Sequence, residues 1–276
     1  MIYDATVCML GEGPLWHPER EDLFWFDIIN HRLHCKSRHW QFDRFVSAAG
    51  WVDKETLLIA TETDLSRFDI ESGSLTPLCQ LEHDNPITRS NDGRADPQGG
   101  FWIGTMGIGA DPRPGAGSIW RYYKGELRKL YGNITVTNAI SFAPEGDTAY
   151  FCDTPTQKIM RVRLDSDGWP KGDPECHVDL TGTDFRPDGA VVDQSGVLWS
   201  AQWGAGRVAG YDLSGREIES FHFPASRTTC PAFGGPDMKT LFCTSAAVTL
   251  PKDADHGKTF AIDTSHVGQT EHRVIL

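Results

Sequence analysis

The sequence predicts an all-β fold, a six-bladed β-propeller whose blades are four-stranded antiparallel sheets. Long stretches of helical periodicity are scarce, and short apolar segments recur along the chain at intervals of 34 to 48 residues. One sixth of the 276 residues is 46 residues, and a period of about 40–50 residues with several strands per unit is typical of propeller blades. A two-sheet sandwich gives no reason for such a period. We expect residues 1–276 to form one domain.

The recurring segments are the predicted second strands of the blades. Each follows a turn-forming stretch, and they begin at residues 22, 56, 100, 148, 196 and 240 with DLFWFDI, TLLIATE, GFWIGTM, TAYFCDT, GVLWSAQ and TLFCTSA. Alternating hairpins such as residues 118–131 and 208–223 follow them, as half-buried outer strands should. We expect Tyr3–Leu10 to close the ring by pairing into the blade that holds residues 258–275, because an open ring leaves unpaired sheet edges.

Composition narrows the classes of partner. The net charge of −12 argues against nucleic acid and anionic membranes, which require a basic surface. No apolar run reaches the roughly 20 residues of a membrane helix, and the N-terminus MIYDATVCMLGEG lacks the basic region of a secretory signal. We therefore expect a cytoplasmic protein. We also expect it to be a monomer or a weak dimer and to act on a small molecule.

The cysteines and one histidine cluster show no metal-binding spacing. Seven cysteines without a C-x-x-C pair are expected to be small buried hydrophobic residues rather than disulfide or zinc ligands. His31, His34 and His39 in NHRLHCKSRHW are predicted to lie on a solvated strand or turn.

Four of the six predicted inner strands carry an oxygen-bearing side chain at a similar place. Glu12 and Asn138 lie 13 residues, and Asn91 and Asp188 lie 11 residues, before a core aromatic of the next strand. The aromatics are Trp25, Phe151, Trp102 and Trp199. We attribute the two-residue difference to turn length. Because inner strands run along the propeller axis, we expect these side chains to meet there.

The oxygens of Glu12, Asn138 and Asp188 suit a hard divalent cation such as Ca²⁺, Mg²⁺ or Mn²⁺, and Zn²⁺ where water completes the shell. The alternative from spacing alone is a ring of polar residues that holds trapped water.

Five ordered motifs identify a resemblance. They are GEGPLWHP (11–18), RSNDGRADPQGGFWIGTM (89–106), TNAISFAPEGDTAYFCDT (137–154), RPDGAVVDQSGVLWSAQWG (186–204) and CPAFGGPDMKTLFCTSA (230–246). Together they resemble the SMP-30/gluconolactonase/LRE-like family. The resemblance implies a six-bladed propeller with one axial divalent metal, Ca²⁺ or Zn²⁺ above all with Mg²⁺, Mn²⁺ or Fe²⁺ as further choices, and hydrolysis of sugar lactones. It assigns the metal ligands to Glu12, Asn138 and Asp188, and the substrate contacts to Arg89 and Asn91.

One departure concerns the sugar. In some family members a glutamate near a Gly-Ser-[Leu/Ile]-[Tyr/Trp] motif helps to bind substrate, but residues 107–120 here read GIGADPRPGAGSIW, without a glutamate. The resemblance therefore predicts a lactone as substrate and leaves the sugar open.

The expected mechanism is attack by water on a polarised lactone carbonyl, with Asp188 as general base. The absence of a G-x-S-x-G motif argues against a covalent acyl-enzyme. Two alternatives stay open: a non-catalytic calcium-binding or interaction propeller, and an aryl esterase or organophosphatase with an apolar mouth formed by Phe185 and Trp203.

Overall fold

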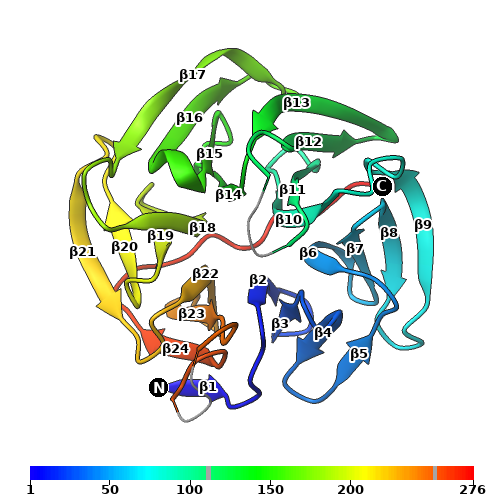
Figure 1. The fold of residues 1–276 in the computed structure, drawn as a ribbon, viewed down its shortest axis with the longest axis horizontal. Coiled ribbons are helices and arrows are strands. Elements are labelled where there is room, and N and C mark those ends of the chain that lie inside the picture. The colour runs from blue at the N-terminus through cyan, green and yellow to red at the C-terminus, as the bar shows by residue number, and fades with distance from the viewer. Residues whose placement is uncertain (110–112, 251–253) are drawn as a thin grey trace.

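The computed structural model describes residues 1–109, 113–250 and 254–276. Within these residues the strands form six four-stranded sheets, arranged as blades around a central axis (Figure 1). The first strand of each blade lies innermost and neighbouring strands pair antiparallel. The predicted six-bladed propeller is confirmed.

Five blades are built from four strands in chain order. Blade 1 contains β2 (Gly11–His17), β3 (Asp22–Asp27), β4 (Arg32–Cys35) and β5 (His39–Gln41). Blade 2 contains β6 (Val46–Asp53), β7 (Thr56–Thr61), β8 (Asp64–Asp69) and β9 (Leu75–Gln80). Blade 3 contains β10 (Thr88–Ala95), β11 (Phe101–Gly107), β12 (Gly117–Tyr123) and β13 (Glu126–Ile134). Blade 4 contains β14 (Thr137–Phe142), β15 (Thr148–Asp153), β16 (Lys158–Leu164) and β17 (Pro170–Asp179). Blade 5 contains β18 (Arg186–Val192), β19 (Leu198–Trp203), β20 (Arg207–Tyr211) and β21 (Glu217–His222). A 3₁₀ turn, η1 (Thr154–Thr156), follows β15.

Blade 6 is completed by both ends of the chain. It contains β22 (Thr228–Gly234), β23 (Thr240–Ser245), β24 (Thr259–Asp263) and the N-terminal strand β1 (Ile2–Asp4). Closure by the N-terminal segment is confirmed, but the pairing is shorter than the predicted Tyr3–Leu10. The chain leaves the edge after Asp4 and enters blade 1, where the backbone N–H groups of Met9 and Leu10 donate to the carboxylate of Asp27 at 3.0 and 3.1 Å.

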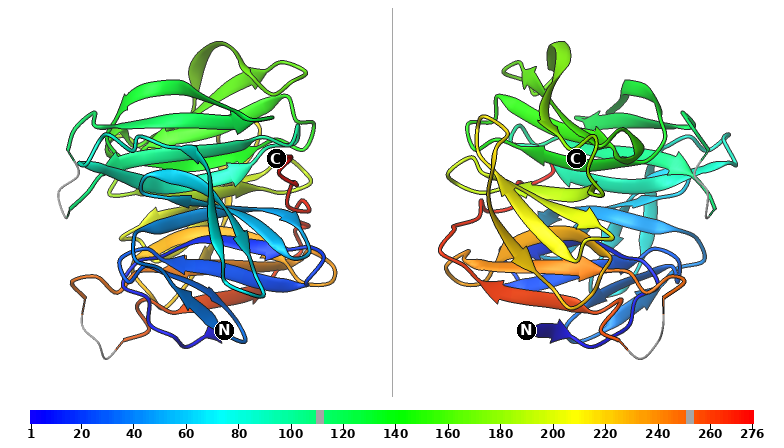
Figure 2. Two further views of the ribbon diagram at one scale, coloured as in Figure 1. Left: turned by 90° about the vertical axis from the view of Figure 1, so that its right-hand side faces the viewer. Right: turned by 60° about the vertical axis from the view of Figure 1, so that its left-hand side comes forward.

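Residues 264–276, the C-terminal tail, do not belong to blade 6 as predicted. Strand β24 is paired with β23 on one side and β1 on the other, and no strand of that sheet lies in residues 264–276. The tail instead crosses the ring (Figure 1), where Gln269 Nε2 donates to the carbonyls of Phe142 and Val192 and Val274 N donates to that of Trp51. In the left view of Figure 2 it runs along one face of the propeller.

The apolar core lies between neighbouring blades. Six clusters of buried residues, among the described residues, each join two adjacent blades. The predicted core aromatics Trp25, Trp102, Phe151 and Trp199 are all buried. The blades are therefore held by side-chain packing as well as by the closed ring, and the axis is free to carry polar groups.

Two composition-based predictions have mixed outcomes. All seven cysteines are free and five of them are buried, but Cys176 is exposed on β17. His34 is buried rather than solvated, because its ring stacks on Trp25 at 5.5 Å between centroids. Among the described residues, no helix has the length and apolar character needed to cross a membrane.

Candidate active site

A cavity of about 760 Å³ opens at the end of the axis where the inner strands begin. All five predicted site residues line it: Glu12 on β2, Arg89 and Asn91 on β10, Asn138 on β14, and Asp188 on β18. Segments separated by up to 176 residues thus supply one pocket. The prediction that these side chains meet at the axis is confirmed for the four strands concerned.

A bulge in each inner strand positions these side chains. The antiparallel register shifts between Glu12 and Leu15, between Asn138 and Ser141, and at the equivalent places in β6, β10, β18 and β22. A bulge bends the strand and re-aims a side chain. Gly13 adopts the left-handed conformation there (φ +51°), and a Cβ at this position would clash with the carbonyl oxygen of Ser47. Glycine is therefore required beside Glu12.

The bulges also explain the spacing of 11 and 13 residues, which turn length does not. Leu15, the first paired residue after the bulge in β2, lies opposite Phe24, which precedes the core Trp25. Gly93, its counterpart in β10, lies opposite Ile103, which follows the core Trp102. The aromatic residues thus occupy different places along the second strand. Glu12 and Asn138 precede their bulges, whereas Asn91 and Asp188 lie within theirs.

A chain of hydrogen bonds fixes the amide side chains. Arg89 Nη1 donates to Asn91 Oδ1 at 2.9 Å, and Asn91 Nδ2 donates to Asn138 Oδ1 at 3.1 Å. Asn138 Nδ2 in turn donates to Thr154 Oγ1 at 2.9 Å, and that hydroxyl donates to the carbonyl of Pro187 at 2.8 Å. Each amide is held in one orientation. The side-chain oxygen of Asn91 points toward Arg89, and that of Asn138 points toward Asn91. The sequence did not predict the part played by Thr154, which also lines the cavity.

The acidic residues of the pocket are buried, and none of the described residues gives Glu12 or Asp188 a cationic partner. Burial, and then the charge of Asp92, raises the pKa of Glu12 to about 8. Burial, followed by the charges of Glu12 and Asp92, raises the pKa of Asp188 well above its usual range. Among the described residues neither Glu12 nor Asp188 has a Lys, Arg or His nitrogen within ion-pair distance. Asp92, a third buried carboxylate that the sequence analysis left unassigned, accepts from the N–H of Ile140 at 2.7 Å.

These features fit a bound divalent cation. Two buried carboxylates and one oriented amide oxygen face a cavity, and a cation would offset the cost of burying the two negative charges. No three His, Cys, Asp or Glu side chains of the described residues converge closely enough to hold an ion by themselves. An ion at this place therefore needs Asn138 as well as Glu12 and Asp188.

The walls of the cavity are largely apolar. They include Leu10, Ile29, Phe45, Met106, Ile108, Val136, Trp203 and Val248. Phe185, predicted to contribute to an apolar mouth, is not among the lining residues; its ring packs under the guanidinium of Arg207 at 4.0 Å. Ile108 and Gly109 bring the 107–120 segment to the pocket, and residues 110–112 of that segment lie outside the described residues.

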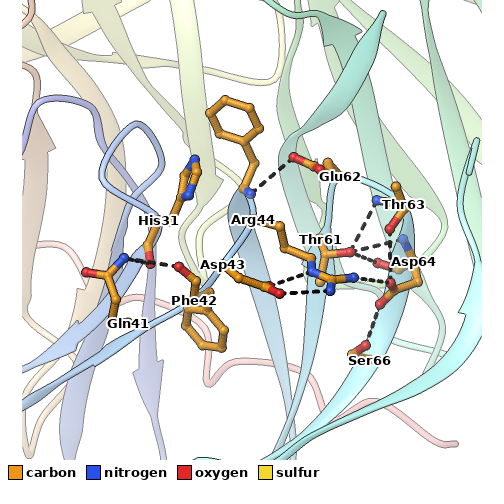
Figure 3. Close-up of polar contacts among 11 residues, drawn as sticks. His31, Gln41, Phe42, Asp43, Arg44, Thr61, Glu62, Thr63, Asp64 and Ser66 are labelled. Atoms are coloured by element: carbon orange, nitrogen blue, oxygen red, sulfur yellow. Dashed lines mark hydrogen bonds and ion pairs between the residues drawn. The ribbon is translucent and has the colours of Figure 1, made fainter. Parts of the chain in front are cut away.

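Phe45 is held by a polar network between blades 1 and 2. Its N–H donates to Glu62 Oε2 and its carbonyl accepts from Glu62 N, both at 3.2 Å. Figure 3 shows the adjoining contacts, in which Arg44 binds Asp43 at 2.8 Å and approaches Asp64 at 3.7 Å. The two bonds with Glu62 hold the backbone of Phe45, and the guanidinium carbon of Arg89 lies 5.9 Å from the centroid of the Phe45 ring.

Known proteins share this architecture along the whole chain. A solved structure of a calcium-binding protein named regucalcin, from Agrobacterium tumefaciens strain C58, is 39% identical, with a TM-score of 0.96 over 100% of this chain and 97% of that one. An L-arabinolactonase of Azospirillum brasilense is 33% identical over 279 residues, 96% of this chain and 91% of the relative. The pentonolactonase XacC of Haloferax volcanii is 30% identical over 287 residues, 97% and 95% of the two chains.

The match to a protein family agrees with the motifs from which the site was predicted. Residues 10–247 match the family described as SMP-30/Gluconolactonase/LRE-like region, and this span includes all five predicted site residues. This chain belongs to the SMP-30/gluconolactonase/LRE-like family of sugar lactone lactonases and regucalcins.

Proposed function

We propose that the protein is a metal-dependent lactonase that opens aldonolactones such as gluconolactone, xylonolactone or arabinonolactone. The observation that carries the proposal is the convergence of Glu12, Asn138 and Asp188 with Arg89 and Asn91 in one axial pocket. A divalent cation, Ca²⁺ or Zn²⁺ in the first place, held by the first three residues would supply Lewis-acid polarisation of the lactone carbonyl. The relatives named as arabinolactonase and pentonolactonase support a sugar lactone as substrate.

The protein's own groups supply positioning and proton transfer. Arg89 donates hydrogen bonds to the sugar hydroxyls or ring oxygen, and burial lowers the pKa of its guanidinium only to about 10, so it stays charged at neutral pH. Asn91 shares this task and keeps Asn138 oriented. Asp188 takes a proton from the water that attacks the carbonyl carbon, and the proton returns to the ring oxygen when the carbon–oxygen bond breaks. The product is the open-chain hydroxy acid.

Two rival functions follow from other features of the same pocket. Its apolar walls would also accept an aryl ester or organophosphate, whereas Arg89, Asn91 and Thr154 at its base favour a hydroxylated ligand. The solved relative named as a calcium-binding protein raises the alternative of ion binding without catalysis.

One panel separates these functions. Metal-stripped protein is assayed with Ca²⁺, Zn²⁺, Mg²⁺, Mn²⁺ or Fe²⁺ added back, on five- and six-membered aldonolactones, phenyl acetate and an organophosphate triester. We expect hydrolysis of aldonolactones above the spontaneous rate with at least one cation. Hydrolysis of the aryl ester alone would move the assignment to an esterase. Ion binding without any hydrolysis would move it to a calcium-binding protein.

A further inference from the structure

Arg227 brings a second guanidinium to the pocket, at the rim opposite the polar base. It lines the cavity together with Trp203, Val248 and Thr249, whereas Arg89 lies at the base with Glu12 and Asp188. Nothing in the sequence motifs singles out Arg227, which stands just before β22. Its position is nevertheless fixed on several sides.

The backbone and the aromatic neighbour hold Arg227 in place. An antiparallel bridge joins it to Trp203 at the end of β19, and its carbonyl accepts from the N–H of Ala246 at 2.9 Å. Its guanidinium carbon lies 4.9 Å from the centroid of the Trp203 ring, an arrangement that favours a cation over the ring face. Nη1 donates to the carbonyl of Val248 and, at 3.1 Å, to the hydroxyl of Thr249.

The rest of the Arg227 guanidinium has no partner within the part of the chain that the structure describes. An arginine carries five N–H donors, and only Nη1 is used here. No carboxylate of the described residues lies within ion-pair distance. Arg207 shows the contrast: it also stacks on an aromatic ring, Phe185, but its two Nη atoms bind Glu217 at 2.8 and 2.9 Å. Arg207 is satisfied within the protein, whereas the described residues leave part of the Arg227 guanidinium unpaired.

The charges in the pocket favour a ligand that carries more than one polar group. A divalent cation would balance the carboxylates of Glu12 and Asp188, and at the rim the Arg227 guanidinium has no carboxylate partner among the described residues. In a protein with a net charge of −12 such a rim is a local exception that attracts anions. A cavity of about 760 Å³ is also in the range that holds ligands larger than a single sugar ring.

We propose that Arg227 binds an anionic group at the end of the substrate remote from the lactone carbonyl, so that the preferred substrates are acidic sugar lactones bearing a carboxylate, sulfonate or phosphate. This inference rests on the proposed lactonase function and goes beyond it by naming a subsite and its ligand chemistry. Trp203 acts as a positioning residue that keeps the guanidinium at the rim. Because the subsite is remote from the reacting atoms, it contributes mainly to KM and leaves kcat nearly unchanged.

The test uses two lactones that differ at the terminal carbon alone, D-glucono-1,4-lactone with a CH₂OH and D-glucaro-1,4-lactone with a carboxylate. We expect the wild-type protein to show a KM for the glucarolactone lower by about tenfold, a preference that shrinks at high salt. Arg227→Gln should abolish the preference while changing kcat/KM for the gluconolactone less than threefold. Arg227→Lys should restore part of it, since the charge is kept. Arg216→Gln, an exposed arginine in the turn after β20, is the matched control and should keep the preference.

The remaining outcomes are decisive as well. Equal KM values for the two lactones in the wild type, or equal losses on both in Arg227→Gln, would overturn the subsite and leave Arg227 as an anchor for the Val248 loop. If neither lactone is hydrolysed with any cation, the proposed function fails, and ligand-observed NMR with D-glucarate and D-gluconate tests the subsite alone. Tighter binding of glucarate to the wild type but not to Arg227→Gln supports it, and equal binding overturns it.

Discussion

The two ends of the propeller axis differ in whether their buried ionisable side chains form ion pairs among the described residues. At the end crossed by the C-terminal tail, Arg94 of β10 pairs with Glu271 of the tail, with side chains only 9% and 6% exposed. At the open end, Glu12 and Asp188 are equally buried, but neither has a cationic partner among the described residues. The same strand β10 contributes to both ends, with Arg89 at the open one and Arg94 at the closed one.

This difference indicates that the paired charges at the closed end stabilise the fold and that the groups at the open end bind a ligand. A buried charge is costly unless a counter-charge and hydrogen bonds offset it. The tail supplies that counter-charge at the closed end, and its backbone also accepts from Trp51 Nε1 at 2.8 Å. At the open end none of the described residues supplies such a counter-charge, and a bound cation would supply it. Changes at the closed end should therefore alter stability, and changes at the open end should alter binding and catalysis.

The largest effect is expected from Asp188→Asn at the open end. The variant keeps the shape of the side chain and one coordinating oxygen but cannot take a proton from water. We expect kcat at saturating metal to fall by about 10²–10⁴-fold, the usual contribution of a positioned base. The measurement is steady-state turnover of the best aldonolactone across a metal titration. Recovery to within a few-fold of the wild type at saturating metal would leave Asp188 as a ligand alone.

At the closed end, Glu271→Leu should lower stability and spare the site. Removing one partner of a buried ion pair typically costs about 3–5 kcal/mol, because the other charge stays buried without compensation. The free energy of unfolding from urea titration is the readout, with lactonase turnover of the folded protein as the check on the open end. The double variant Arg94→Met/Glu271→Leu should recover much of the loss. A double variant as unstable as the single one would show that the tail, rather than the charge pair, carries the effect.

Glu12→Gln should weaken metal binding but raise the stability of the metal-free protein. Loss of an outer partner of a metal site already costs about 10–100-fold in affinity, so loss of a charged ligand should cost at least that much. The thermal stabilisation on adding cation should shrink in parallel. Metal-free Glu12→Gln should nevertheless unfold at higher urea than the metal-free wild type at neutral pH, because burial raises the pKa of Glu12 in the folded state and so favours the unfolded state, where the group ionises freely. Glu126→Gln, on the exposed strand β13, is the control; unchanged affinity in Glu12→Gln would remove Glu12 from the site.

Asn91→Ala tests substrate recognition at the open end without removing a proposed ligand. The variant loses a hydrogen bond to substrate and the bond that orients Asn138. We expect kcat/KM to fall by an amount equivalent to about 1–3 kcal/mol, with metal still bound. The loss should be larger for a hydroxylated aldonolactone than for unsubstituted γ-butyrolactone. Equal losses on the two substrates would assign Asn91 a structural role.

The open end was predictable from the sequence to a greater extent than the closed end. The blade repeat and the motifs placed Glu12, Asn91, Asn138 and Asp188 around one axis, because every blade repeats the same strand order. Their register was not predictable, since a bulge shifts the pairing without leaving a period in the sequence. The tail was assigned to the wrong place because its contacts join single residues far apart, such as Trp51 and Glu271, separated by 220 positions. No local pattern encodes such contacts.

The smallest effect is expected from His272, which lies in the tail at the closed end. Burial lowers the pKa of His272; the charge of Arg94 adds to this shift, while Glu271 and Asp96 oppose it. In the unfolded chain the pKa is about 6.5, so on acidification the unfolded state takes up a proton that the folded state resists. The stability contributed by neutral His272 is present above pH 6.5 and is lost as the pH falls toward the lowered folded pKa. When the pH is lowered from 7.5 to 5, the Tm of His272→Gln should therefore fall by about 2 °C less than the Tm of the wild type. The measurement is thermal unfolding at both pH values, with exposed His39→Gln as the control. An unaltered pH dependence in His272→Gln would mean that His272 does not contribute to acid sensitivity.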